Sequence, residues 1–184
     1  TALAIKPEDG ELVIWISLDL VSFCRDLKKT LYNELSKHIP GFTEDRLICS
    51  CIHNHTGPYL SSRRFRKNRG DDGTIKINIP EGCITPEEYI EKTFIPNTVK
   101  ACIEAYNSLA PAGFSAVLGH ATVGHCRRIK MRDGSSIMYG NSDDYNFDRL
   151  EGPSDSGVEM MYIYDEQDEL TGLILNVNCP AQVV

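Results

Sequence analysis

The opening part of the chain alternates apolar runs with an amphipathic stretch, which is the pattern of a strand, a helix and a second strand. Residues 11–20 (ELVIWISLDL) form a nearly continuous run of β-forming apolar residues, and this run predicts a buried strand. Apolar residues then recur at helical spacing from 22 to 37, and Pro40-Gly41 ends that pattern. Residues 46–52 (RLICSCI) form a second apolar run. This order predicts a βαβ unit with parallel strands.

The rest of the chain predicts one more helix and several strands. Thr85-Pro86 is a good helix start, and this helix is expected to continue to Leu109 with an interruption or a kink at Pro96. Strands are expected over three apolar runs, 112–123, 158–164 and 170–178. The alternation favours an α/β fold, a layered sandwich whose mixed β-sheet opens with the βαβ unit. The late hairpin, 158–178, is expected to make that sheet mixed.

Length and composition indicate one ordinary globular domain. The 184 residues are 41% hydrophobic and 24% charged, which suffices for one sizeable core, so residues 1–184 are expected to form a single domain. The absence of an initiator Met and the apolar end at Val183-Val184 suggest that this domain is a portion of a larger one. No apolar stretch approaches the roughly 20 residues of a transmembrane segment.

The charge balance excludes one class of partner. A formal net charge of −7 argues against binding of nucleic acid, because phosphate recognition draws on clustered Lys and Arg. The one basic run, residues 63–69 (RRFRKNR), lies in a polar segment without clear periodicity. It is interpreted as a solvated loop, with an anion-binding lid as the alternative.

The seven cysteines fit neither a disulfide framework nor a zinc finger, since their number is odd and no paired CxxC spacing occurs. Cys49, Cys51 and Cys102 stand in apolar runs and are interpreted as small core residues. Unpaired thiols favour a cytoplasmic location, while secretion stays open if a signal peptide precedes the sequence.

Two histidines directly follow the second predicted strand, in the segment His53-Asn54-His55-Thr56-Gly57-Pro58. Residues two apart in extended backbone project to the same side, so the two imidazoles are expected to share a face. Asp19 ends the neighbouring strand in the same sense, at the edge where open α/β sheets bind ligands. Such a pair suits a divalent metal or proton transfer, and the alternative is a hydrogen-bonded structural pair.

These residues resemble a known family. Asp19-Leu20 at the end of the first strand, and Cys51 to Pro58 after the βαβ unit, resemble the start of the catalytic domain of the neutral, non-lysosomal ceramidases. The corresponding segment in that family is a His-x-His-Ser-Gly-Pro motif, whose first His binds the catalytic zinc and whose second lies beside the scissile amide. The resemblance therefore implies that His53 is a Zn²⁺ ligand and that His55 is catalytic.

Two later positions extend the resemblance. The family places an active-site arginine after a strand end, and Arg127 in Cys126-Arg127 is the matching residue. The family's second zinc histidine follows an apolar strand, and here Cys179 stands at that place. A thiolate is a competent zinc ligand that would lower the Lewis acidity of the ion. For Arg127 a surface arginine, and for Cys179 a core thiol, are the alternatives.

The sequence also departs from the family. Tyr59-Leu60 replaces the small residues that follow the Gly-Pro pair, and Pro180-Ala181-Gln182 replaces the residues after the second zinc histidine. The remaining family ligands, a Glu and a Tyr, and the serine nucleophile lie beyond the matched region. These departures favour a substrate other than ceramide.

Three functional classes follow. The leading hypothesis is a ceramidase-like zinc hydrolase domain that acts on a small-molecule or lipid-like amide, or on a related carbonyl bond. The second is an amidohydrolase-type metal hydrolase, which fits worse because that barrel needs roughly 250 residues. The third is a non-catalytic binding module on the same fold. The sequence leaves the oligomeric state open.

Overall fold

The computed structural model describes residues 1–58, 60 and 81–180. These residues divide into two compact units, which are Thr1–Leu109 (unit 1) and Ala110–Pro180 (unit 2). Each unit is described by itself. The basic run at 63–69, predicted to be a solvated loop or a lid, lies outside the described residues.

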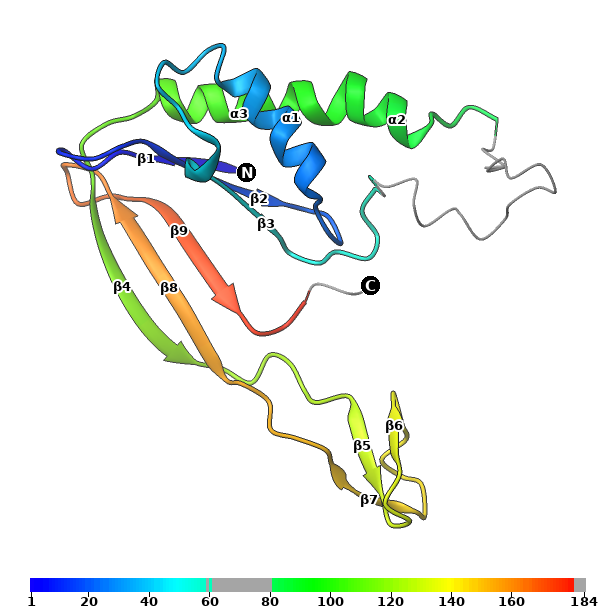
Figure 1. The fold of residues 1–184 in the computed structure, drawn as a ribbon. Coiled ribbons are helices and arrows are strands. Elements are labelled where there is room, and N and C mark those ends of the chain that lie inside the picture. Colours follow the sequence, from blue (N-terminus) through cyan, green and yellow to red (C-terminus); the bar gives the residue numbers. More distant parts are fainter. Residues whose placement is uncertain (59, 61–80, 181–184) are drawn as a thin grey trace. The chain divides into compact units, whose positions relative to one another are not determined.

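Unit 1 is built on a three-stranded sheet in the order β1-β2-β3 (Figure 1). The strands are β1 (Ala2–Ile5), β2 (Val13–Leu18) and β3 (Leu47–Cys51). Strands β2 and β3 are parallel, with α1 (Arg25–Leu35) between them in the sequence, so the predicted βαβ unit is confirmed. A strand that the sequence analysis did not predict, β1, pairs antiparallel with β2 and makes this sheet mixed.

One face of this sheet carries the core of unit 1. Leu31 and Leu35 of α1 are fully buried, as is Ile14 of β2, and they belong to one cluster. Each buried side chain of this size contributes roughly 1.5–3 kcal/mol relative to an exposed position. The helical spacing that predicted α1 is therefore the spacing of its core-facing side chains.

The predicted long helix is present, with a π-helical segment inside it. It comprises α2 (Pro86–Tyr89), a π-helical segment (Ile90–Phe94) and α3 (Ile95–Asn107). A capping box holds its start, because the Thr85 hydroxyl accepts from the Glu88 amide at 3.0 Å and the Glu88 carboxylate accepts from the Thr85 amide at 3.1 Å. The irregular segment lies in the turn before Pro96, which has no N–H for the ladder of that turn, and Pro96 itself lies in the first turn of α3.

Unit 2 contains two antiparallel sheets. One has the order β4-β8-β9, from β4 (Gly113–His120), β8 (Gly157–Tyr164) and β9 (Leu170–Val177). The other has the order β6-β5-β7, from β5 (Arg128–Met131), β6 (Ser136–Met138) and β7 (Phe147–Leu150). In the turn between β5 and β6, Gly134 has a positive φ of 89°.

The α/β class and the mixed sheet with its βαβ unit are thus confirmed, with one difference. The hairpin β8–β9 does not mix the first sheet, because it pairs with β4 in a purely antiparallel sheet. The layered sandwich stays a prediction. So does the expectation that residues 1–184 form a single domain that is a portion of a larger one.

Candidate active site

The two histidines of the predicted site follow β3 at the carboxyl edge of a parallel strand pair. Leu18 of β2 is opposite Cys51 of β3, and the Ile52 amide donates to the Leu18 carbonyl at 3.1 Å. Both strands therefore end at the same edge, where the crevice of an open α/β sheet forms. The residues after this edge, 53–58, form the loop that carries the candidate chemistry, and we call it the histidine loop.

The two imidazole rings lie next to each other. Their centroids are 4.7 Å apart, and the ring planes meet at 66°. The sequence predicted this proximity from extended backbone, but the cause is different, because His53 has a positive φ of 62°. Histidine is among the non-glycine residues that enter this region more readily, usually at turns. The rings therefore meet across a turn, after the strand has ended.

A backbone carbonyl fixes the His53 ring. Nδ1 of His53 lies 2.8 Å from the Val21 carbonyl oxygen, in the segment that joins β2 to α1. A carbonyl oxygen can only accept, so Nδ1 carries a proton, and in a neutral imidazole with this tautomer the lone pair is on Nε2. A histidine that binds a metal in a protein commonly donates its other ring N–H in this way. Sequence reasoning missed this partner, because a backbone carbonyl leaves no signal in the sequence.

The turn of the histidine loop is held by side-chain and backbone contacts. The Asn54 side-chain oxygen accepts from the Thr56 amide at 2.9 Å and from the Thr56 hydroxyl at 2.7 Å. At Gly57, a Cβ atom would lie 2.4 Å from the carbonyl oxygen of Asp19. Only glycine permits this approach, so Gly57 lets the loop pack against the end of β2. Asp19 thus supports the loop through its backbone, and its side chain is exposed.

A small apolar cavity lies beside the histidine loop. Its volume is about 110 Å³, and Val21 lines it, the residue whose carbonyl binds His53. Pro58 of the histidine loop and Leu60 also line it, opposite side chains from the start of α1. This cavity offers apolar surface to a bound molecule near the two imidazoles.

Arg127 lies in unit 2, on the loop before β5. Its guanidinium carbon is 4.8 Å from the ring centroid of Tyr139, and its carbonyl accepts from the Tyr139 amide at 2.9 Å. A guanidinium stacked on an aromatic ring is restricted in orientation, because the cation is attracted to the ring face. Tyr139 is a contact that the sequence analysis missed, since no spacing rule relates it to Arg127.

Cys179 lies close to the loop that leads to Arg127. A Cβ atom on Gly124 would be 3.3 Å from the Cys179 sulfur, and 3.2 Å from the Asn178 carbonyl oxygen. Gly124 precedes His125 and Cys126, and the Cys126 amide donates to the Ser154 hydroxyl at 2.8 Å. Within unit 2, the two predicted site residues thus belong to neighbouring segments.

Three other thiols, Cys49, Cys51 and Cys102, have raised pKa values. Burial raises the pKa of Cys102 to about 12, with the Cys49 thiol as a smaller cause. Burial likewise raises the pKa of Cys49 to about 11 and raises the pKa of Cys51. A thiol with a raised pKa is a poor nucleophile and a poor metal ligand at neutral pH. These three residues are core thiols, as the sequence predicted.

The donor types fit part of a zinc site. Nε2 of His53 is an available imidazole donor, and a Cys179 thiolate is the other ligand type that zinc prefers. Among residues 1–58, 60 and 81–180, however, no three or more His, Cys, Asp or Glu side chains come together as a metal site. The contact of His53 Nδ1 with the Val21 carbonyl is therefore the strongest local feature that is typical of a metal ligand, and a complete ligand set is not shown.

The fold is similar to that of solved ceramidase structures. One, described as ceramidase complexed with C2, has a TM-score of 0.63 at 15% sequence identity and covers 95% of this chain. Another, neutral ceramidase from Pseudomonas aeruginosa, has a TM-score of 0.62 at 16% identity and also covers 95% of this chain. The chain thus has the fold of part of a neutral ceramidase, which confirms for the fold the resemblance inferred from its residues. It spans about a quarter of the length of these structures.

The sequence itself matches no family model and no curated protein. At 15–16% identity, the structural match defines the fold and leaves the chemistry to be argued from the residues. In the part of the chain that the structure describes, no helix is long and apolar enough to cross a membrane.

Proposed function

We propose that this chain is the amino-terminal portion of a zinc-dependent hydrolase domain that cleaves an amide or a related carbonyl bond. The observation that carries the proposal is the fixed tautomer of His53, whose Nδ1 is held by the Val21 carbonyl at 2.8 Å with the His55 ring alongside. The ceramidase-like fold supports the same reaction class. The predicted sandwich of layers belongs to this proposal, as the architecture of the larger domain.

His53 and Cys179 are the proposed zinc ligands of this chain. His53 offers Nε2, because Nδ1 already donates to a carbonyl. Cys179 offers a thiolate at the position where the resemblance places a second histidine. Zinc at such a site polarises a carbonyl group or activates a nucleophile. The thiolate donates more charge than an imidazole does, so the Lewis acidity of the ion is lower than with two histidines.

His55 and Arg127 are the proposed catalytic residues. An imidazole transfers protons near neutral pH, and the contact with the His53 ring keeps His55 beside the ligand. Arg127 stabilises the negative charge that develops on the carbonyl oxygen, since an arginine stays charged throughout. Because the guanidinium stacks on Tyr139, its orientation is already restricted, so it loses less conformational entropy when substrate binds.

The substrate is a small or lipid-like amide other than ceramide. Tyr59-Leu60 and Pro180-Ala181-Gln182 replace the residues that the family has beside its two zinc histidines. In the family these positions lie where the substrate approaches, so the replacements favour another substrate. The amidohydrolase barrel is set aside, because the described residues form three three-stranded sheets and no eight-stranded barrel.

The first test is the metal content of the longest natural form of the protein, measured by elemental analysis. We expect near-stoichiometric zinc, a loss of zinc in His53→Ala and in Cys179→Ala, and no loss in the control His38→Ala. His38 is an exposed histidine next to the end of α1, outside the proposed site.

A further variant, His55→Ala, distinguishes the role of a zinc ligand from the role of a catalytic acid or base. It is expected to keep its zinc while amide hydrolysis falls by roughly 10²–10⁴-fold, the usual contribution of a general acid or base. The proposal of a zinc hydrolase would be overturned if the wild-type protein contained no metal. It would also be overturned if both His53→Ala and Cys179→Ala kept their zinc. A non-catalytic binding module on the ceramidase fold would then be the better description.

A further inference from the structure

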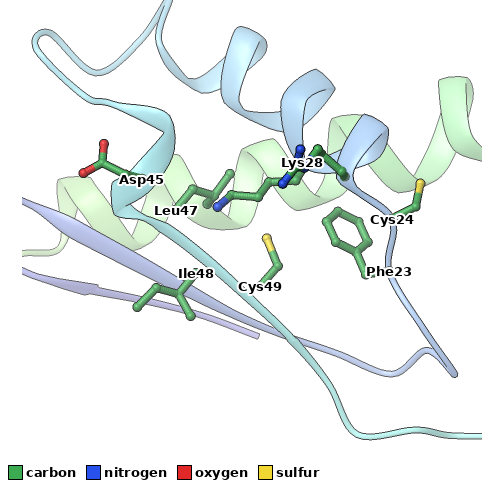
Figure 2. A pocket seen from close by; sticks show the side chains of 8 residues that line it. Phe23, Cys24, Lys28, Asp45, Leu47, Ile48 and Cys49 are labelled. Atoms are coloured by element: carbon green, nitrogen blue, oxygen red, sulfur yellow. The ribbon is translucent and has the colours of Figure 1, made fainter.

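A second pocket of unit 1 shares Phe23 and Cys24 with the small cavity beside the histidine loop, and the rest of its lining has no role in the proposed hydrolase (Figure 2). It lies between the start of α1 and the start of β3, and its volume is about 400 Å³. Small-molecule sites commonly have volumes of roughly 300–1,000 Å³. We call it the α1–β3 pocket. Its size is sufficient for a small organic ligand.

The α1–β3 pocket carries excess positive charge. Arg25 and Lys28 both line it, and neither makes an ion pair with any described residue. The one acidic residue of the lining, Asp45, is already paired with Arg46 at 3.3 Å, and Arg46 does not line the pocket. Two cations that form no ion pair within the described part of the chain therefore border the same pocket.

Lys28 is directed along the pocket. Figure 2 shows its side chain reaching from α1 toward Leu47 and Asp45, with the Cys49 sulfur on the α1 side of β3. The Lys28 charge lowers the pKa of two residues that line the pocket, Cys49 and Asp45. It opposes the rise that burial causes in the pKa of Cys49, and it adds to the causes that lower the pKa of Asp45, of which the Thr43 hydrogen bond is the largest.

The remaining wall is apolar. Phe23, Leu47 and Ile48 line the pocket, and the Phe23 ring rests against the Phe94 ring with centroids 6.1 Å apart. Leu47 is fully buried, so this wall is anchored in the core of unit 1. Positive charge and apolar surface thus border one cavity.

We propose that the α1–β3 pocket binds a phosphate monoester that carries a small apolar or aromatic group. A phosphate monoester carries a charge of roughly −1.5 to −2 at pH 7, which matches two cations, whereas a carboxylate brings one charge. Arginine and lysine are the side chains that proteins use for phosphate groups. The apolar wall of Phe23, Leu47 and Ile48 receives the rest of the ligand.

The test is calorimetric titration of the 184-residue chain with phenyl phosphate, beside inorganic phosphate and benzoate. We expect phenyl phosphate to bind most tightly, because only it combines the dianion with a ring. Lys28→Gln and Arg25→Gln are each expected to weaken its binding by about tenfold or more. The matched control is Lys29→Gln, which removes the same charge from an exposed position on α1 that does not line the pocket, and it is expected to change the affinity less than twofold.

Three results would overturn the proposal. The first is no binding of phenyl phosphate at millimolar concentration. The second is an equal loss in Lys29→Gln and Lys28→Gln, which indicates general charge attraction without a site. The third is equal affinity for phenyl phosphate and inorganic phosphate, which removes the role of the apolar wall. Thermal melting of each variant checks that it is folded, and none of these results depends on zinc or on amide hydrolysis.

Discussion

The two units of this chain bury their apolar residues to very different extents. Unit 1 has a continuous core in which residues of β2, α1 and α3 pack together, and Leu31, Leu35 and Cys102 are fully buried. Among the described residues of unit 2, the buried apolar side chains are Ile129, Met131 and Val158. Strands β4 and β9 of its β4-β8-β9 sheet carry exposed apolar residues, of which Phe114 is 72% exposed.

The difference separates two ways in which an apolar run can be used. In unit 1 the helices cover one sheet face, so the runs that predict strands also form a core. In the β4-β8-β9 sheet, apolar residues project from both faces, as in strands that are covered on both sides in a complete protein. Exposed apolar surface on this scale marks a binding or packing surface. Unit 1 is therefore expected to account for most of the stability of the 184-residue chain.

The largest expected contrast is between truncations in the two units. Leu31→Ala removes a fully buried side chain from unit 1 and is expected to cost about 2–5 kcal/mol of unfolding free energy. Phe114→Ala removes a side chain that is 72% exposed in unit 2 and is expected to cost less than about 0.5 kcal/mol. Urea unfolding gives both values.

Trp15, the one tryptophan, makes this experiment specific. Its indole donates to the Ser50 hydroxyl at 3.0 Å within the unit 1 sheet, so its emission reports on unit 1. Far-UV circular dichroism reports on both units. If Phe114→Ala shifts the tryptophan transition as far as Leu31→Ala does, unit 1 is not the main source of stability.

A smaller contrast is expected in alkaline solution. Burial raises the pKa of Cys102 from about 9 in the unfolded chain to about 12 in unit 1. Between these values the unfolded chain loses a proton that the folded chain keeps, so a higher pH favours unfolding. The contribution of Cys102 to stability is therefore constant below about pH 9. It falls above that value by up to about 1.4 kcal/mol per pH unit.

The control for this pH dependence is Cys102→Ala, which removes the thiol. The variant is less stable at neutral pH because it leaves a small cavity, but its stability is expected to fall less steeply from pH 9 to 11. The difference between the two slopes cancels the titration of Lys and Tyr residues elsewhere. Equal slopes in the wild type and the variant would show that Cys102 ionises as easily in the folded state as in the unfolded one.

The fold was predictable where one apolar pattern served one purpose. The run at 11–20 and the helical spacing after it gave β2 and α1, because their buried side chains all face one core. The destination of the β8–β9 hairpin was not predictable, since alternation defines a strand and says nothing of which strand it pairs with. The pairing of β8 with β4 and the pairing of β1 with β2 both depend on tertiary contacts.

The site was predictable as residues but not as geometry. The sequence placed His53 and His55 after a strand and indicated metal or proton chemistry. It did not indicate the Val21 carbonyl that fixes His53, nor the left-handed backbone that turns its ring to His55. Both features belong to the backbone, for which residue type is a weak guide. The roles of His53, His55, Arg127 and Cys179 stay predictions that metal analysis and kinetics will test.

The smallest expected contrast concerns local anchors, and it tests whether the two units also differ in how tightly their turns are coupled to the whole. Thr85→Ala removes the cap of α2 in unit 1, where the Thr85 hydroxyl accepts from the Glu88 amide at 3.0 Å, and is expected to cost about 1 kcal/mol. Asp133→Ala removes a carboxylate that accepts from the Ser135 amide at 2.8 Å in an exposed turn of unit 2.

Loss of the Asp133 contact is expected to cost only a few tenths of a kcal/mol, because solvent replaces it on an exposed turn. Urea unfolding followed by circular dichroism measures both variants in the same chain. A cost for Asp133→Ala equal to that for Thr85→Ala would mean that the β5–β6 turn is coupled to global unfolding. Unit 2 would then have a cooperative structure of its own, in spite of its exposed sheet, and the difference in burial would not translate into a difference in stability.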